Sequence, residues 1–318
     1  MKKKLIIFAL LFGAVSLTIE IKAQGAEFEF PDREEWSDWR ETERDFDPGW
    51  DDGQCDEEDD SSLAPKRSDD TITMMTYNVW HRNFKYIDSI PRYAEVISFI
   101  NPDVIALQEL RGGANFEALK IATGMRGEML NTHNTTEDDI GRKRNGIGIM
   151  WKPSLDTPKI TTKKLPFGEQ VAYMVAEFNN FCFVCTHYPV NVKPEILEKW
   201  YRRRTTRNIL NNNAVKNCIK SGKPVYIGGD FNEAPDDANG AIQLFVDAGF
   251  EVLNDVLTYP YTYPTPVKQA PQGLADMIIE YNRNPYRELI ETRIPEFPSE
   301  AHKKLSDHYP YVVKVKLK

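Results

Sequence analysis

The sequence lacks apolar runs of the roughly 20 residues that cross a membrane, has little cysteine and contains neither of two common catalytic motifs. Its 318 residues are 41% hydrophobic, 28% charged and 11% aromatic. This composition excludes a collagen-like, wholly disordered or multi-span membrane chain. No G-x-x-x-x-G-K-[ST] loop occurs, which argues against a P-loop nucleotide hydrolase. The absence of a G-x-S-x-G turn argues against a serine esterase.

The first 23 residues have the pattern of a secretory signal peptide. Met1–Lys4 is basic, Leu5–Ile19 is apolar over 15 residues, and Ala23 is a small residue suited to cleavage. Because about 20 apolar residues are needed to cross a bilayer, we expect removal on export rather than retention as an anchor. The protein is therefore predicted to be periplasmic or secreted in a bacterium, with no integral membrane span after cleavage and no evident obligate protein partner.

Charge is distributed unevenly along the chain. The formal net charge is -8, but residues 24–60 carry -14, whereas residues 61–318 carry +3. Dense like charge with no helical or alternating period resists compaction, so 24–70 is predicted to be an acidic disordered linker, with three tryptophans that could dock a partner. Residues 71–318 are predicted to form one α/β domain with mixed sheets. A nearly neutral domain is compatible with a phosphate-bearing substrate.

Apolar runs and breaks locate the expected elements of this domain. Strands are predicted at 72–77, 104–107, 146–151, 173–178, 181–186, 224–228, 276–279 and 311–317. Helices are predicted over 92–100 and, as one long helix, over 195–220.

The four cysteines are Cys55, Cys182, Cys185 and Cys218. Export permits disulfides, but residues three apart on a strand face opposite sides. A bond between Cys182 and Cys185, or a zinc site shared by them, is therefore not expected. Buried free thiols are the favoured interpretation.

Polar residues follow or open many of the predicted strands. They are Asn78, Glu109, His187, Asp230 with Asn232, Asp276, and Asp307 with His308. Each alone is typical of a cap or turn, but active sites of α/β proteins gather at strand ends, so their recurrence predicts a common site. The carboxylates of Glu109 and Asp307 with the Asn78 carbonyl suit Mg²⁺, with Mn²⁺ or Ca²⁺ as alternatives, better than zinc.

Six segments resemble, in order, the motifs of the endonuclease/exonuclease/phosphatase superfamily, metal-dependent phosphoesterases that include pancreatic-type deoxyribonuclease. The segments are Thr76–Val79, Pro102–Glu109, Thr186–His187, Gly229–Asn232, Ala275–Ile278 and Ser306–Pro310. The resemblance implies an α/β fold, specifically a four-layer α/β/β/α sandwich with two mixed sheets and one catalytic cleft.

The resemblance also implies how metal and water would be held. Glu109, helped by Asn78 and Asp307, would hold the divalent metal against a phosphate oxygen. Asp230 would align or deprotonate the attacking water, and Asn232 would hydrogen-bond the phosphate or that water.

The resemblance assigns charge stabilisation to the two histidines. His308, oriented by Asp276, would stabilise the phosphorane-like charge, and His187 would donate to another phosphate oxygen or to the leaving group. Arg111 resembles a phosphate-contacting arginine of secreted deoxyribonucleases, although a solvated surface arginine is an equal alternative. These enzymes carry an aromatic and an acid before the third strand, where this chain has Arg142–Asn145, so the sequence identifies no carboxylate partner for His187.

The predicted function is an exported Mg²⁺-dependent hydrolase that cleaves phosphodiester bonds by in-line water attack. A nuclease acting on nucleic acid is the first prediction, since His187 resembles the deoxyribonuclease, sphingomyelinase and deadenylase branches. A phospholipid or small-molecule phosphoesterase is the alternative, and a catalytically inactive binding module is more remote.

Some residues outside the motifs are given ordinary interpretations. His81, His133 and His302 are expected to be surface or packing histidines. The arginines at 202–204 and 207 are expected to form a solvated helix face, with phosphate contacts as the alternative. The Pro-rich loop 259–266 carries tyrosines that could stack on a base or sugar, or simply pack.

Overall fold

The computed structural model describes residues 70–132, 146–165, 171–190, 192–263, 273–282 and 287–317. The predicted signal peptide, nearly all of the predicted linker, Cys55, His133 and the basic loop at 142–145 lie outside the described residues. Within the described ranges, no helix combines the length and the apolar character needed to cross a membrane.

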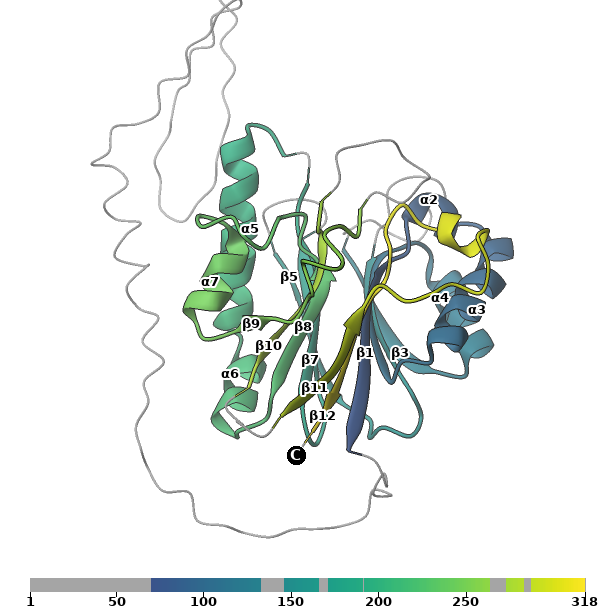
Figure 1. The fold of residues 1–318 in the computed structure, drawn as a ribbon, viewed down its shortest axis with the longest axis horizontal. Coiled ribbons are helices and arrows are strands. Elements are labelled where there is room, and N and C mark those ends of the chain that lie inside the picture. Colours follow the sequence, from purple (N-terminus) through teal and green to yellow (C-terminus); the bar gives the residue numbers. More distant parts are fainter. Residues whose placement is uncertain are drawn as a thin grey trace, which may run out of the picture. The chain divides into compact units, whose positions relative to one another are not determined.

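Two six-stranded sheets form the centre of the domain (Figure 1). The first has the order β11 (Glu288–Arg293), β12 (Tyr311–Lys316), β1 (Thr71–Asn78), β2 (Val104–Leu110), β4 (Gly146–Trp151) and β3 (Arg126–Asn131). The second has the order β5 (Lys159–Lys164), β6 (Ala172–Glu177), β7 (Cys182–His187), β8 (Val225–Asp230), β10 (Asp276–Tyr281) and β9 (Glu251–Val252). Both sheets are mixed, because β1 with β2 and β7 with β8 are parallel, whereas the other pairs are antiparallel.

Helices cover the outer faces of the two sheets, as Figure 1 shows. On the first sheet lie α2 (His81–Phe84), α3 (Ile90–Ile100) and α4 (Gly113–Thr123), with 3₁₀ turns η1 (Ile87–Ser89) and η2 (His302–Lys304) nearby. On the second lie α5 (Glu195–Leu210), α6 (Asn213–Lys220) and α7 (Ala241–Asp247). The predicted four-layer α/β/β/α sandwich is confirmed.

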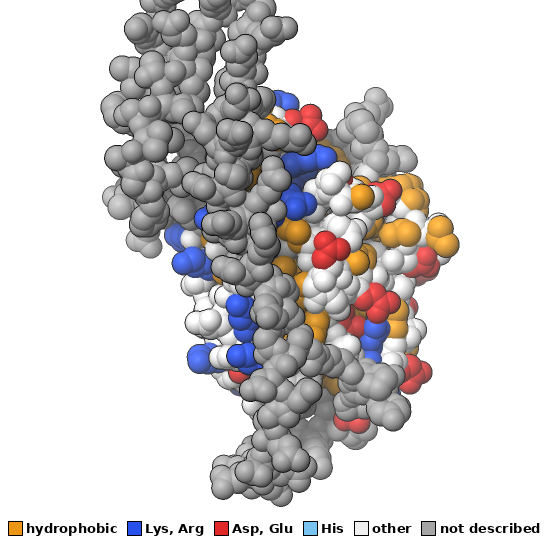
Figure 2. Space-filling view, turned by 90° about the vertical axis from the view of Figure 1, so that its left-hand side faces the viewer, with side chains coloured by type: hydrophobic (Ala, Val, Ile, Leu, Met, Phe, Trp, Pro, Cys, Tyr) orange, Lys and Arg blue, Asp and Glu red, His pale blue; other side chains and the backbone are white. Residues whose placement is uncertain are grey.

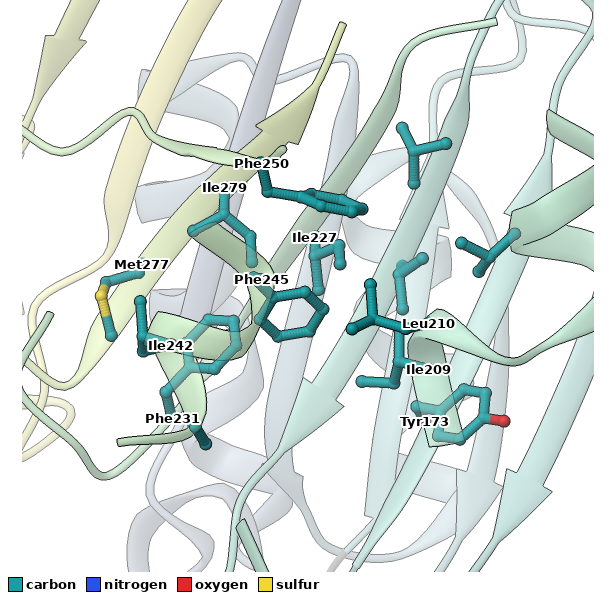
Figure 3. Close-up of a cluster of buried hydrophobic side chains, with 14 of the residues drawn as sticks. Tyr173, Ile209, Leu210, Ile227, Phe231, Ile242, Phe245, Phe250, Met277 and Ile279 are labelled. Carbon is teal, nitrogen blue, oxygen red and sulfur yellow. The ribbon is translucent and has the colours of Figure 1, made fainter. Parts of the chain in front are cut away.

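Three apolar clusters explain the four layers. Successive strand residues face opposite sides, so Met74 of β1 packs between the sheets and Met75 packs beneath α3 and α4. The third cluster joins the second sheet to its helices; there Ile227 of β8 packs with Ile209 of α5 and Phe245 of α7 (Figure 3). Strands buried on both faces produce the continuous apolar runs seen in the sequence.

The predicted single helix over 195–220 is wrong. The segment forms two helices, α5 and α6, which Asn211 and Asn212 separate. The Asn212 side chain accepts a hydrogen bond of 2.9 Å from the backbone N–H of Ala214 and so caps α6. Asparagine favours a cap over a helix interior because its side chain competes for backbone groups.

A disulfide joins Cys182 of β7 to Cys218 of α6. The expectation of a buried free thiol is therefore wrong for Cys182 and correct for Cys185, which is buried and free. The bond pairs a strand with the helix packed on it, across 36 residues of sequence. Spacing within the strand correctly excluded a Cys182–Cys185 bond but could not identify a partner on a helix.

The predicted elements omit the edge strands β3, β5, β9 and β11. Edge strands bury little, so they lack the apolar runs that mark central strands, and β5 carries Lys159, Lys163 and Lys164. Lysine on an edge discourages pairing with another chain.

The helical face outside the second sheet carries charged side chains of both signs. Figure 2 views this face; Lys and Arg side chains gather toward its left side, with Asp and Glu toward the right. Arg202 of α5 differs from the predicted solvated arginines because it is buried, with its Nε 3.0 Å from the Pro189 carbonyl and an ion pair to Glu198. It anchors the segment after β7 to α5.

Candidate active site

Strand register places three of the predicted residues in one row. His187 at the end of β7 pairs with Asp230 at the end of parallel β8, and Asp230 pairs with Asp276 at the start of antiparallel β10. All three side chains are buried. Because paired positions on adjacent strands lie about 5 Å apart, the second sheet brings an imidazole and two carboxylates together.

The first sheet contributes Asn78 at the end of β1. Its Nδ2 donates a 2.9 Å hydrogen bond to Oδ2 of Asp230, which joins the ends of the two sheets. Its Oδ1 accepts a 3.0 Å bond from the backbone N–H of Trp80. The amide is therefore oriented from both ends, with an oxygen lone pair still able to face a cation.

His308 enters from the segment before β12. Its Nδ1 lies 2.8 Å from Oδ2 of Asp276, and its backbone N–H donates to Oγ of Ser306 at 3.1 Å. Ser306 donates in turn to the Asn78 carbonyl at 2.6 Å. These bonds fix the imidazole so that Nε2 points toward Asp230, at 3.8 Å from Oδ2.

Asp230 lies at the centre of this arrangement. Besides Asn78 and His308, Nε2 of His187 lies 3.5 Å from Oδ2, and the backbone N–H of Asn232 donates to Oδ1 at 2.9 Å. Burial acts to raise the pKa of Asp230, but the charge of His308 and the contacts with His187 and Asn78 lower it below its ordinary value. Asp230 is thus an anion, and it supplies the carboxylate beside His187 that the sequence did not identify.

These carboxylates raise the pKa of both imidazoles. Burial acts to lower the pKa of His308, but the charges of Asp276 and Asp230 outweigh it and raise the pKa to about 10. For His187, burial also acts to lower the pKa, and the adjacent Asp230 raises it above its usual value. Burial raises the pKa of Asp276 to about 6, against the opposing charge of His308.

A β-bulge directs Glu109 out of its strand. The pairing of β2 with β4 shifts register between Leu107 and Leu110, and Glu109 has a φ of 58°. Its Oε2 accepts a 3.1 Å hydrogen bond from the backbone N–H of His81 and a short one involving His81 Nδ1. Burial acts to raise the pKa of Glu109, but the contacts with His81 and the charge of His187 lower it to about 2.

His81 is a site residue that the sequence analysis missed. It was expected to be an ordinary surface or packing histidine, whereas it contacts the predicted metal ligand Glu109. Its position three residues after Asn78, at the same strand end, was the available signal. The contact spans 28 residues, so only the fold shows it.

Backbone strain is concentrated at this end of the domain. Non-glycine residues with φ in the left-handed region cost about 1–3 kcal/mol each and cluster at functional sites. In the described part of the chain, three such residues lie here: Trp80, Glu109 and Asn232. The fourth, Asn101, ends α3, where this conformation is common.

The donor atoms at this end of the domain fit a hard divalent cation. Glu109 is an anion whose bonds from His81 both fall on Oε2, and Asn78 and Asp307 add buried oxygen atoms. Asp230, Asp276 and His308 also present ligand atoms within 4.8 Å of one another. However, His308 Nδ1 is bonded to Asp276 and the pKa of His308 is raised to about 10, so this trio is better suited to proton transfer.

The remaining predicted residues are placed less centrally. Asn232 directs its side-chain Nδ2 to the Tyr188 carbonyl at 3.0 Å, so only its backbone contacts Asp230. Arg111 lies half-buried two residues after Glu109 and is not among the residues joined by the hydrogen bonds above. The Tyr263 ring, from the Pro-rich loop, lies 4.6 Å from the ring of His308.

Comparison with known proteins agrees with this geometry. The sequence model described as the Endonuclease/Exonuclease/phosphatase family matches residues 75–308. No curated protein matches the chain.

Solved structures share the fold at low sequence identity. The human Nocturnin catalytic domain with bound sulfate anion has a TM-score of 0.59 and 16% identity, covering 79% of this chain and 96% of that one. The Bacteroides thetaiotaomicron mannosyl-6-phosphatase Bt3783 has a TM-score of 0.58 and 15% identity, covering 77% and 99%. Humanized D. rerio TDP2 has a TM-score of 0.57 and 17% identity, also covering 77% and 99%.

Proposed function

Because the chain belongs to the endonuclease/exonuclease/phosphatase family, whose members are metal-dependent hydrolases of phosphoester bonds, we propose that it is an exported Mg²⁺-dependent phosphodiesterase that cleaves nucleic acid. One observation carries the proposal: an anionic carboxylate, Asp230, lies between the imidazoles of His308 and His187, and both imidazoles have a raised pKa. That combination provides a proton acceptor for water, a cationic donor in His308 and a second imidazole donor in His187 for a phosphate.

The metal would be held by the oxygen atoms of Glu109, Asn78 and Asp307. When bound, a divalent cation polarises a phosphoryl oxygen and neutralises developing negative charge. Glu109 suits this role because its low pKa keeps it ionised across the physiological range. Carboxylate and amide oxygens favour Mg²⁺ over softer metals.

Asp230 would orient the attacking water and accept its proton. The hydrogen bonds from Asn78 and the Asn232 backbone hold the carboxylate in place and leave it ionised. A fixed, ionised acceptor within hydrogen-bond reach of a water is the requirement for a general base. Asn232 acts here through its backbone, which differs from the phosphate contact expected from the resemblance.

His308 and His187 would stabilise charge on the phosphoryl group. His308 is the stronger candidate, because Asp276 occupies its Nδ1 and leaves Nε2–H as the donor. His187, on the same row, would donate to a second oxygen or to the leaving group. Donors held before the reaction lower its barrier, since they need no reorganisation as charge develops.

Two observations favour nucleic acid as substrate. The Tyr263 ring next to His308 offers an aromatic face of the kind that stacks on bases. The domain is also not acidic, because residues 61–318 carry a net charge of +3, whereas residues 24–60 carry -14. Export is supported by the signal-peptide pattern and by the Cys182–Cys218 bond, since disulfides persist mainly in oxidising compartments.

A plasmid-nicking assay tests the proposal. The chain from residue 24 is incubated with supercoiled DNA and Mg²⁺, beside an Asp307→Ala variant and an EDTA control. Nicking by the wild type alone, abolished by EDTA, is the expected result, with the variant slower by about 10³-fold. If neither protein nicks DNA but the wild type hydrolyses bis-p-nitrophenyl phosphate, the substrate is a lipid or small phosphodiester. If neither substrate is cleaved, the proposed activity is wrong.

A further inference from the structure

His81 makes a two-point contact with Glu109. Its backbone N–H donates to Glu109 Oε2 at 3.1 Å, and its imidazole Nδ1 contacts the same oxygen. The carboxylate side chain is 17% exposed and the imidazole 29%. Both side chains of the contact are therefore partly buried.

The backbone is strained on both sides of this contact. Trp80, directly before His81, has a φ of 53°, and Glu109 has a φ of 58°. Neither residue is glycine, so each conformation is unfavourable by about 1–3 kcal/mol and persists only where surrounding structure imposes it. The Asn78 Oδ1 bond to the Trp80 N–H is part of that structure.

We propose that His81 is a positioning residue that holds the Glu109 carboxylate in the orientation required for divalent-metal binding. The Nδ1–H donates to Oε2, which leaves Oε1 directed to the cation. Partners of metal-bound carboxylates and imidazoles act in this way, and their loss typically weakens metal binding about 10–100-fold. The inference rests on the proposed function, because it assigns the metal to Glu109.

The chain provides a matched control in His302. Its Nε2 lies 2.8 Å from Oε2 of Glu95 and its Nδ1 lies 2.8 Å from Oγ of Ser299. It is thus another histidine bonded to a glutamate, but Glu95 belongs to the exposed side of α3 rather than to the site. Its removal should leave metal binding unchanged.

The test measures Mn²⁺ binding to the full chain by titration calorimetry for the wild type and for His81→Ala, His81→Asn, His81→Gln and His302→Ala. An asparagine Nδ2 occupies the place of imidazole Nδ1, whereas a glutamine places its amide near Nε2. We expect His81→Ala and His81→Gln to raise the Kd about 10–100-fold. His81→Asn and His302→Ala should remain close to the wild type, and saturating Mg²⁺ should restore most of the activity of His81→Ala.

Wild-type affinity in His81→Ala would overturn the inference, as would a His81→Asn variant as weak as His81→Ala. Thermal unfolding of each variant shows whether it is folded. If His81→Ala does not fold, the comparison of His81→Asn with His81→Gln decides the question. A Glu109→Gln variant distinguishes failure of the role of His81 from failure of the metal assignment to Glu109. If Glu109→Gln binds Mn²⁺ as the wild type does, the metal assignment in the proposed function is wrong, whatever His81 does.

Discussion

Nδ1 of His308 lies 2.8 Å from Oδ2 of Asp276, and both side chains are buried. Asp276 opens β10 of the second sheet, whereas His308 precedes β12 of the first. The contact therefore spans the two sheets and does more than pack them together. It determines which imidazole nitrogen faces Asp230 and keeps the ring charged.

Replacement of Asp276 by Asn should lower activity at neutral pH by about 10²–10⁴-fold. The pKa of His308 is raised to about 10 chiefly by Asp276 and Asp230, so it should fall when one of these charges is removed. Because His308 acts as a protonated donor, activity is lost as pH rises through its pKa, and the alkaline limb of the kcat profile should move to lower pH. Asp237→Asn, which breaks the Lys199 ion pair elsewhere, is the control. An unchanged profile in Asp276→Asn would contradict the assignment.

Glu109 should stabilise the metal-free protein in a defined pH window. Its pKa is lowered from 4.5 to about 2, so the unfolded chain takes up its proton first as pH falls. The stabilisation is fully present above about pH 4.5 and is lost between there and about pH 2. Urea unfolding in EDTA should therefore show a difference between wild type and Glu109→Gln that shrinks from pH 6 to pH 3. A difference independent of pH would argue that Glu109 is not held as an anion.

Loss of the disulfide should reduce stability markedly. The bond between Cys182 and Cys218 closes a loop with a sequence separation of 36. Chain-entropy arguments then give a loss of about 3–4 kcal/mol in the free energy of unfolding on its removal. Urea unfolding of a Cys182→Ser/Cys218→Ser protein, and of the wild type with reductant, measures this. Cys185→Ser is the control, since Cys185 is free and its removal should leave the effect of reductant unchanged. If reductant destabilises the double variant as much as it destabilises the wild type, the pairing is refuted.

Alanine at Gly229 should damage both stability and activity. Gly229 of β8 pairs with Thr186 of β7, and a Cβ there would lie 2.5 Å from the Thr186 carbonyl oxygen. Overpacking of this kind costs about 1–3 kcal/mol, and the displaced strands carry His187 and Asp230 one residue further on. A shift of about 1 Å between such groups can lower the rate about 10²-fold. Thermal unfolding and kcat should both fall in Gly229→Ala.

Gly113→Ala is the matched control for that prediction. No atom lies within 4 Å of a Cβ built at Gly113, at the start of α4. It should retain its stability and activity. If both variants behave alike, space at Gly229 is not limiting.

Most of the site could be predicted because its residues end apolar strands. A buried strand needs apolar side chains, so Asn78, Asp230 and Asp276 mark the points where strands leave the core. Those positions can be identified from the local sequence, because each lies next to an apolar run. The resemblance of the six segments then implied the layers and a role for each residue.

Contacts between distant segments could not be predicted in the same way. The edge strands are too exposed to show apolar runs. In the sequence His81 resembles a surface histidine, and only the β-bulge at Glu109 brings the two residues into contact. Likewise, only strand register places the Asp230 carboxylate beside His187. The sequence left the partner of Cys218 open, and the packing of α6 on β7 brings it to Cys182.

The sequence by itself therefore determined the fold class, the strands of the core and the set of polar residues that gather at one end of the domain. Hydrophobic period and strand length are local properties, and they depend only on residues near one another in the chain. The tertiary structure decided the partners. It determined which carboxylate raises the pKa of which imidazole, which histidine contacts Glu109 and which cysteines form the disulfide. These depend on distances of a few ångströms between segments far apart in sequence, and only the packing of the two sheets and their helices sets such distances.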